Sequence, residues 1–133
     1  MSENEIALDE KHQLAVIDSY KSMAEHSKWI TATAAILFGI AVNMSKESAT
    51  KIKFAFFLLM AVAFMASIVL AAGFILMTID LSLAMRLNKP ISKADIDKMT
   101  RQLVSQIGAF MLGMFFMGCM AIHDLALQSL KEP

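Results

Sequence analysis

The sequence predicts an all-α integral membrane protein with three transmembrane helices, and the distribution of charge is the main reason. The 133-residue chain has 12 basic and 12 acidic side chains, all of them outside three apolar segments, residues 29–44, 54–79 and 103–122. An ionised group at the centre of a bilayer costs roughly 2.5–3.5 kcal/mol, so long uncharged segments are typical of helices in hydrocarbon. A soluble domain of this size could hardly bury residues 54–79 on all sides, which makes a soluble bundle the less favoured interpretation.

The first predicted element is an amphipathic arm, residues 1–28. One third of its helical circumference is mainly apolar, and the opposite side is charged. The residues of the apolar side are Ile6, Gln13, Val16, Ile17, Tyr20, Met23, Ala24 and Ser27. We expect this arm to lie in the cytoplasm and to continue directly into the first span.

The remaining residues, 29–133, form the predicted membrane domain. Its first span, residues 29–44, is the shortest, because 16 residues of helix reach only about 24 Å across a hydrocarbon core of roughly 30 Å. Lys28 and Trp29 favour it as a snorkelling cation and an interfacial ring. The short loop at residues 45–53 predicts that this span and the next are antiparallel neighbours.

The second and third spans are predicted to extend beyond the membrane as a helical hairpin. Span two continues as a ladder of apolar residues at four-residue spacing and is expected to end at the sequence Asn88-Lys89-Pro90, because proline disfavours helix at the preceding residue. Ser92 and Asp95 then form a capping box that starts the third helix. We expect the arm to pack against the hairpin, forming a small bundle on Leu83, Leu87, Ile96 and Met99.

The basic residues predict the orientation. Eight of them lie in the arm and the 80–102 hairpin, against four in the 45–53 loop and the tail. The positive-inside rule therefore places the N-terminus and the hairpin in the cytoplasm and the C-terminus outside. We expect a multi-pass protein of the bacterial inner (cytoplasmic) membrane.

Small residues recur at four-residue spacing in every span, which permits close approach of helix backbones in lipid. They give each span a candidate packing face. A weakly polar side of span three could alternatively line a narrow pore. The candidate packing or pore-lining residues are Ala35, Gly39, Ala63, Ser67, Ala71, Ser105, Gly108, Ala109 and Gly113.

Three polar residues at the ends of the spans are candidate interfacial groups. Asp80 directly follows the second apolar segment and could be a proton or cation site, although we favour a residue that marks the membrane interface. His123 and Asp124 close the third span at the opposite surface. Neighbouring residues on a helix point about 100° apart, so we favour a structural role over an imidazole tuned by the carboxylate.

The methionines of span three invite comparison with a copper transporter, because thioethers suit Cu(I). The residues Met111, Met114, Met117 and Met120 are three apart, so they spread over half of the helix surface and form no single cage. We therefore expect no metal site. An oligomer could still collect one methionine per chain into a ring.

The leading functional hypothesis is a small, non-enzymatic membrane protein that self-associates as a pore, channel or membrane-perturbing effector. No catalytic arrangement, phosphate-binding loop or cofactor site is expected, and the balanced charge argues against nucleic acid as a partner. The first alternative is an accessory or immunity-type subunit of a larger membrane complex. Copper or proton transport is the second alternative.

Overall fold

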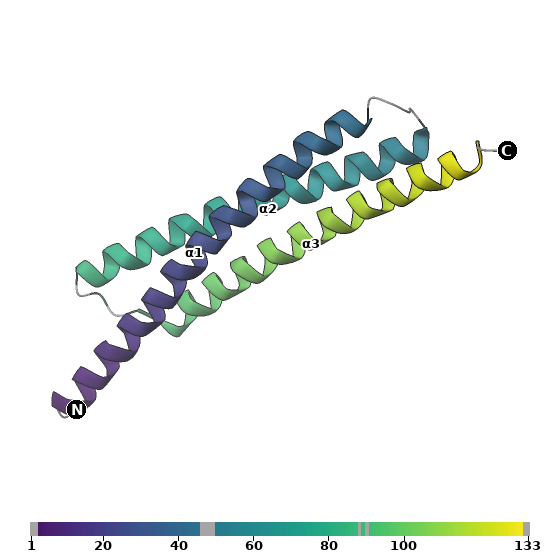
Figure 1. Ribbon diagram of the computed structural model, residues 1–133. Helices are drawn as coiled ribbons and strands as arrows, with labels where there is room; N and C mark the ends of the chain where they lie inside the picture. Colours follow the sequence, from purple (N-terminus) through teal and green to yellow (C-terminus); the bar gives the residue numbers. More distant parts are fainter. Residues whose placement is uncertain (1–2, 46–49, 88, 90, 132–133) are drawn as a thin grey trace.

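The chain forms three long helices, which confirms the all-α prediction. In the computed structural model, α1 spans Glu3–Ser45, α2 spans Lys51–Arg86 and α3 spans Lys93–Ser129 (Figure 1). The structure describes residues 3–45, 50–87, 89 and 91–131, and the side chains of residues 11–43 within α1. The side chain of Ile6, residues 46–49 of the predicted loop, Asn88 and Pro90 lie outside this described part.

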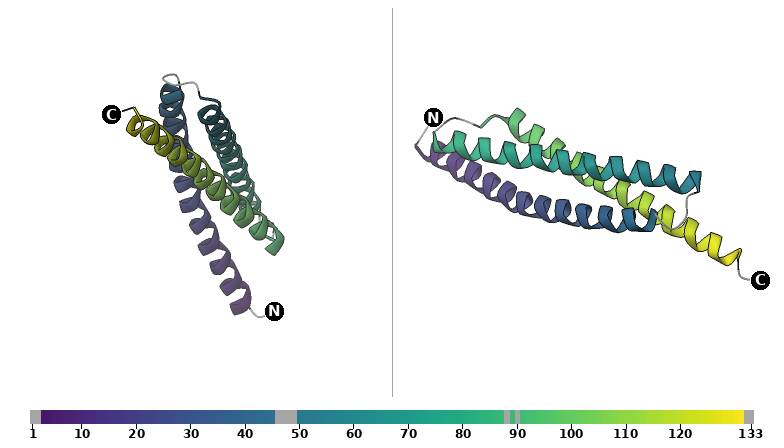
Figure 2. Two further views of the ribbon diagram at one scale, coloured as in Figure 1. Left: turned by 90° about the vertical axis from the view of Figure 1, so that its right-hand side faces the viewer. Right: turned by 90° about the horizontal axis from the view of Figure 1, so that it is seen from above.

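The three helices lie along one another in an elongated arrangement. Figures 1 and 2 show the N-terminus and the α2–α3 connection at one end, and the C-terminus and the α1–α2 connection at the other. Successive helices are therefore antiparallel, as the short loops predict. Helix α2 has extensive contacts with both neighbours, whereas α1 and α3 touch each other little.

Two of the helices, α2 and α3, are long and apolar enough to cross a membrane. They contain the predicted second and third apolar segments. The first segment, residues 29–44, forms part of the C-terminal half of α1, where the predicted helical arm continues into it without a break.

The helix ends follow local sequence signals. The Thr50 hydroxyl caps α2 by accepting a hydrogen bond of 3.4 Å from the backbone N–H of Lys53. Helix α2 ends at Arg86, two residues before the predicted stop sequence.

The predicted capping box at the start of α3 is confirmed. The Ser92 hydroxyl accepts from the Asp95 N–H at 3.2 Å, and the Asp95 carboxylate accepts from the Ser92 N–H at 3.3 Å. The Ser92 hydroxyl also donates to this carboxylate at 2.7 Å. Hydrogen bonds from the side chain and backbone of Ser92 stabilise the charged carboxylate, which lowers the pKa of Asp95 below its ordinary value of 3.8.

One core cluster lies toward the end that holds the α2–α3 connection. Residues of α1 at helical spacing pack there against both other helices; its buried members are Ile17, Tyr20, Ala24, Phe74, Leu81 and Met99. Met99 and the partly buried Ile96 contribute as predicted. Leu83 and Leu87 do not, since 55% and 60% of their surfaces remain exposed. The side of α2 that α1 covers carries Leu81 instead.

A second core cluster lies nearer the other end and is rich in aromatic rings. Its buried residues are Ala34, Ala41, Met60, Phe64 and Met120. The Phe38 ring of α1 stacks on the Phe57 ring of α2 with centroids 6.2 Å apart, and Phe64 of α2 contacts Phe110 of α3 at 5.9 Å. Aromatic packing therefore holds α2 between its two neighbours.

Candidate functional site

Gln106, the largest fully buried polar side chain among the described residues, lies between the two core clusters. The Ser27 hydroxyl donates to its Oε1 at 2.7 Å, and its Nε2 donates back to the Ser27 carbonyl at 3.3 Å. From α2, the Ser67 hydroxyl donates to the Gln106 carbonyl at 3.3 Å. All three residues have no exposed surface, so one residue from each helix meets in a closed hydrogen-bonded group, here called the central polar layer.

A second amide extends this contact between α2 and α3 by one helical turn. The Gln102 Nε2 donates to the Leu70 carbonyl at 3.3 Å. A β-carbon at position 73 would overlap the Gln102 amide, so Gly73 makes room for that side chain. The sequence signal for both glutamines was weak, because an uncharged amide near the start of a span resembles any interfacial polar residue.

Another hydrogen-bonded group lies toward the end with the α2–α3 connection. The Tyr20 hydroxyl of α1 shares a hydrogen bond of 2.5 Å with the Thr100 hydroxyl of α3. Thr100 in turn donates to the Ile96 carbonyl at 3.0 Å. Tyr20 is otherwise buried in the first core cluster, so this contact joins the predicted arm to α3 through one polar atom.

The opposite end of the bundle holds an ion pair between α2 and α3. The Lys53 ammonium lies 2.8 Å from Oδ2 of Asp124, with 4% of the Lys53 side chain and 24% of the Asp124 side chain exposed. His123 Nδ1 lies 4.0 Å from Oδ1 of the same carboxylate, beyond hydrogen-bond distance. The sequence pattern identifies His123 and Asp124 as candidates but gives no signal for Lys53, because a lysine beside an apolar segment resembles an ordinary loop charge.

Asp80, the remaining interfacial candidate, has an exposed side chain on α2. With Asp95 and Lys98 it borders a small cavity of about 240 Å³ between α2 and α3. Within the described part of the chain, Asp80 has no ion pair and no contact with His123 or Asp124. The structure therefore separates the polar candidates into two groups at opposite ends.

The small residues fall into two sets. Those on α2, Ala63, Ser67 and Ala71, are buried against the neighbouring helices of the same chain. Gly113 of α3 is also buried, with the Phe64 ring packed directly over it. The other set is Ala35, Gly39, Ser105 and Gly108, which are exposed, and Ala109, which is half-buried.

The methionines of α3 point in different directions. Met111 is 62% exposed and Met114 is 40% exposed, whereas Met120 is 1% exposed in the second core cluster. Among the described residues, no three His, Cys, Asp or Glu side chains gather in a way that could hold a metal ion. Cys119 is half-buried and has a free thiol.

These groups can fix the register of the helices, but their arrangement provides neither a nucleophile beside a base nor a pair of facing carboxylates among the described residues. Comparison of the chain with models of known protein families, with curated protein sequences and with solved structures finds no match in any of the three.

Proposed function

We propose that this chain is a small integral membrane protein that self-associates through surfaces of small residues. It is non-enzymatic, crosses the bilayer three times and has its N-terminus and α2–α3 connection in the cytoplasm. The observation that carries the self-association is the exposed set of small residues on α1 and α3.

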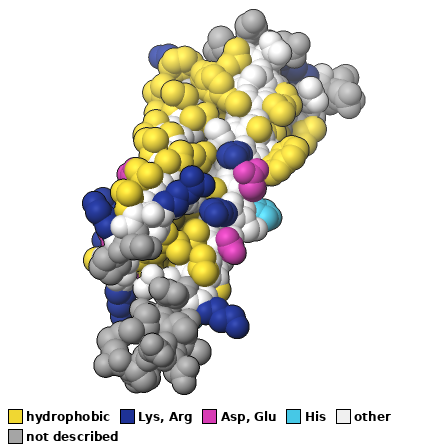
Figure 3. Space-filling view, turned by 90° about the vertical axis from the view of Figure 1, so that its left-hand side faces the viewer, with side chains coloured by type: hydrophobic (Ala, Val, Ile, Leu, Met, Phe, Trp, Pro, Cys, Tyr) yellow, Lys and Arg dark blue, Asp and Glu magenta, His cyan; other side chains and the backbone are white. Residues whose placement is uncertain are grey.

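The outer surface of the bundle favours lipid over water as its surroundings. Only 28% of the most apolar stretch of α2 and 17% of that of α3 are buried inside the chain. Figure 3 shows hydrophobic side chains covering much of one face and charged side chains gathered beside them. The exposed large side chains include Phe54, Leu58, Val62, Met65, Val69 and Leu76 on α2, and Val104, Met111, Phe115 and Ile122 on α3. A protein that exposed so large an apolar surface to water would tend to aggregate.

The third membrane crossing that we propose is the uncharged segment of α1, residues 29–44. The second core cluster covers this segment on one side, while Ile36 and Ile40 remain 64% and 46% exposed. These side chains suit contact with lipid tails. The N-terminus and the α2–α3 connection lie at the same end, and the arm and hairpin there together hold eight basic residues against four in the 45–53 loop and the tail, which favours cytoplasmic placement of that end.

Self-association is supported by two glycines that no described side chain covers. A β-carbon at Gly39 or at Gly108 would meet no atom within 4 Å, in contrast to Gly113. In lipid, a small residue on a helix surface permits a partner helix to approach closely. A second copy of this chain presents matching surfaces, so helices α1 and α3 can contribute to an interface between copies.

A pore between copies is the form of assembly that we favour. Within one chain, the central polar layer consists of groups that hydrogen-bond to each other and have no exposed surface. These groups line no water-filled path along a single bundle, so a permeation path would have to lie between chains. The exposed Ser105 on α3 is a residue of this chain that could face it.

The mass of the particle in nanodiscs tests self-association. We expect wild-type protein to give a particle mass that is a defined multiple of the chain mass. The double variant Gly39→Leu with Gly108→Leu should lower the particle mass toward that of a single chain. Gly118→Leu is the matched control, because Gly118 also has open space but lies about 110° around α3 from the middle of the face that Ser105 and Gly108 form. A wild-type particle of one chain would contradict the proposal.

A monomer that is active only beside a larger membrane protein would instead support the accessory-subunit alternative. Leakage of a small dye from vesicles containing wild-type protein, and its loss in the double variant, would support the pore. Assembly without leakage would contradict the pore and retain self-association.

A further inference from the structure

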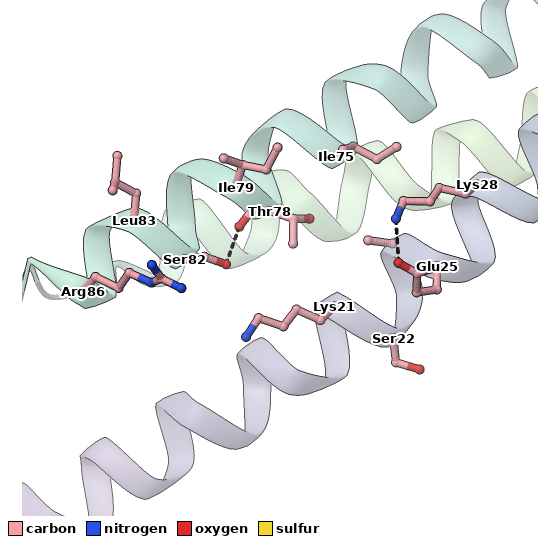
Figure 4. A pocket seen from close by; sticks show the side chains of 11 residues that line it. Lys21, Ser22, Glu25, Lys28, Ile75, Thr78, Ile79, Ser82, Leu83 and Arg86 are labelled. Atoms are coloured by element: carbon pink, nitrogen blue, oxygen red, sulfur yellow. Dashed lines mark hydrogen bonds and ion pairs between the residues drawn. The ribbon is translucent and has the colours of Figure 1, made fainter.

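A cavity of about 660 Å³ lies between α1 and α2, toward the end that holds the α2–α3 connection. Its volume is in the range of about 300–1,000 Å³ that is typical of small-molecule sites. Helix α1 contributes a mainly charged wall and α2 a mainly apolar one (Figure 4). The cavity therefore suits a ligand that is charged at one end and apolar at the other.

The charged part of the lining is mainly basic. It holds Lys21, Lys28 and Arg86, with Glu25 as its one carboxylate among the described residues. Glu25 is already paired with the Lys28 ammonium at 2.6 Å. Among the described residues, the ion-pair contact of Lys21 is a loose one of 3.9 Å with Asp18, and the two side chains are 59% and 77% exposed.

Arg86 forms no ion pair with any residue that the structure describes. In Figure 4, the Lys21 ammonium extends from α1 toward α2, and the Arg86 side chain lies at the same end of the opening. The two cations thus leave their charge available to an anion that enters from outside. A guanidinium and an ammonium are both suited to phosphate oxygens.

The apolar part of the lining consists of Ile75, Ile79 and Leu83 along α2. The hydroxyls of Thr78 and Ser82 do not compete for the ligand as donors, because they donate to the Phe74 and Thr78 carbonyls at 2.9 and 2.8 Å. A hydrocarbon chain can therefore lie on this wall without leaving a donor unpaired.

The position of the cavity along the helices indicates the kind of ligand. The uncharged segment of α2 ends at Ile79, and that of α1 begins directly after Lys28. Both residues line the cavity, so it crosses the boundary between the charged and the uncharged parts of each helix. In a bilayer, this is the depth at which lipid phosphates meet the acyl chains.

We infer that this cavity binds an anionic phospholipid, with its phosphate between Lys21 and Arg86 and an acyl chain against Ile75 and Ile79. The inference rests on the membrane placement proposed above but not on the number of chains in the assembly. Basic pockets between membrane helices on the cytoplasmic side are a common recognition mode for anionic headgroups. The site would tie the position of α1 against α2 to the lipid composition of the cytoplasmic leaflet.

Native mass spectrometry of the detergent-solubilised protein tests the inference with two lipids that differ only in headgroup, dioleoyl phosphatidylglycerol and dioleoyl phosphatidylcholine. We expect the wild-type chain to bind the phosphatidylglycerol about tenfold more tightly. The pair Lys21→Gln with Arg86→Gln should remove about tenfold of that affinity, while the conservative pair Lys21→Arg with Arg86→Lys should retain most of it.

The matched control is Lys11→Gln with Arg101→Gln, which removes the same two kinds of charge at exposed positions away from the cavity. We expect it to leave the headgroup preference unchanged. Equal loss in the control would assign the preference to general surface charge and overturn the inference. Equal binding of both lipids by the wild-type chain would overturn it too.

Addition of inorganic phosphate at millimolar concentration distinguishes the two sources of the anion. A lipid site should retain phosphatidylglycerol, because the acyl chain contributes to binding. Displacement of the lipid by phosphate would show a site for a free anion and overturn the lipid assignment. The same spectra report the number of chains, so a monomer that prefers phosphatidylglycerol would keep this inference and contradict self-association.

Discussion

Replacement of Gly113 by alanine tests whether the contact between α2 and α3 depends on close backbone approach. A β-carbon at this position would lie 2.5 Å from Cε1 and 2.6 Å from Cδ1 of the Phe64 ring. Carbon atoms in favourable contact are about 3.5–4.0 Å apart, so the two helices would have to separate by about 1 Å or the ring would have to turn. Phe64 has no exposed surface, which leaves the ring little space to turn.

The expected magnitude follows from two opposing effects. Overpacking of a filled core costs about 1–3 kcal/mol, whereas alanine in place of glycine inside a helix gains about 0.8–1.0 kcal/mol. Gly118→Ala, on the same helix but with open space around the new methyl group, isolates the second effect. The difference between Gly113→Ala and Gly118→Ala should therefore equal the steric cost, about 1–3 kcal/mol in the free energy of unfolding.

Titration of the protein in mixed micelles with sodium dodecyl sulfate, followed by far-ultraviolet circular dichroism, measures this difference. In a Phe64→Ala background, Gly113→Ala should become as well tolerated as Gly118→Ala, because the ring that it meets is gone. Equal stability of the two glycine variants in the wild-type background would refute the reasoning, since it would mean that Phe64 does not hold α2 against Gly113.

The same titration checks two further predictions, and hydrogen exchange checks a third. Gln106→Leu should lower the free energy of unfolding by about 1–2 kcal/mol, because it leaves the buried Ser27 hydroxyl without its acceptor. Adding Ser27→Ala should recover most of that loss, whereas independent residues would give losses that add. Lys53→Met should lower the free energy of unfolding by about 1–2 kcal/mol. This is less than the roughly 3–5 kcal/mol for breaking a fully buried ion pair, because the Asp124 side chain is 24% exposed. A variant as stable as wild type would argue against a stabilising pair. Because the pKa of Asp95 is lowered in the folded chain, its contribution to the start of α3 is present above pH 3.8 and is lost as the pH falls through the folded value. Amide exchange in the first turn of α3 should therefore show lower protection at pH 3 than at pH 6 after correction for intrinsic rates, and Ser92→Ala should reduce this difference.

Helix existence and helix ends were predictable from sequence because their causes are local. The absence of charge from long segments predicts helices in an apolar medium, and the Ser92–Asp95 capping box predicts where α3 begins. Both depend on residues within a few positions of each other. No knowledge of the neighbouring helices is needed for them.

Helix rotation was harder to predict, because a pattern on one helix does not say which neighbour covers it. The ladder that ends with Leu83 and Leu87 suggested the face of α2 that α1 covers. Steps of four residues turn by about 40° each, so such a ladder drifts around the helix and leaves the buried side. The observed contact follows Phe74 and Leu81, which are seven residues apart and drift far less.

The buried polar residues were not predictable as partners because they are distant in sequence. Ser27 and Gln106 are 79 positions apart, and each taken alone resembles an ordinary polar residue near the end of a span. Lys53 precedes an apolar segment, a position at which lysine usually extends to the interface. Its burial depends on Asp124, which only the antiparallel packing of α2 and α3 brings near.

The placement of these polar contacts suggests how the register of the helices is set. In lipid, apolar side chains gain little by leaving the tails for a neighbouring helix, so hydrogen bonds and close packing must select one register. The contacts lie at three heights: Tyr20 with Thr100, Ser27 with Gln106, and Lys53 with Asp124. The first two tie α1 to α3, although these helices otherwise touch little, and the third ties α2 to α3 at the far end. A shift of one residue along any helix would separate at least one pair and leave a polar group buried without its partner, which makes the observed register the favoured one.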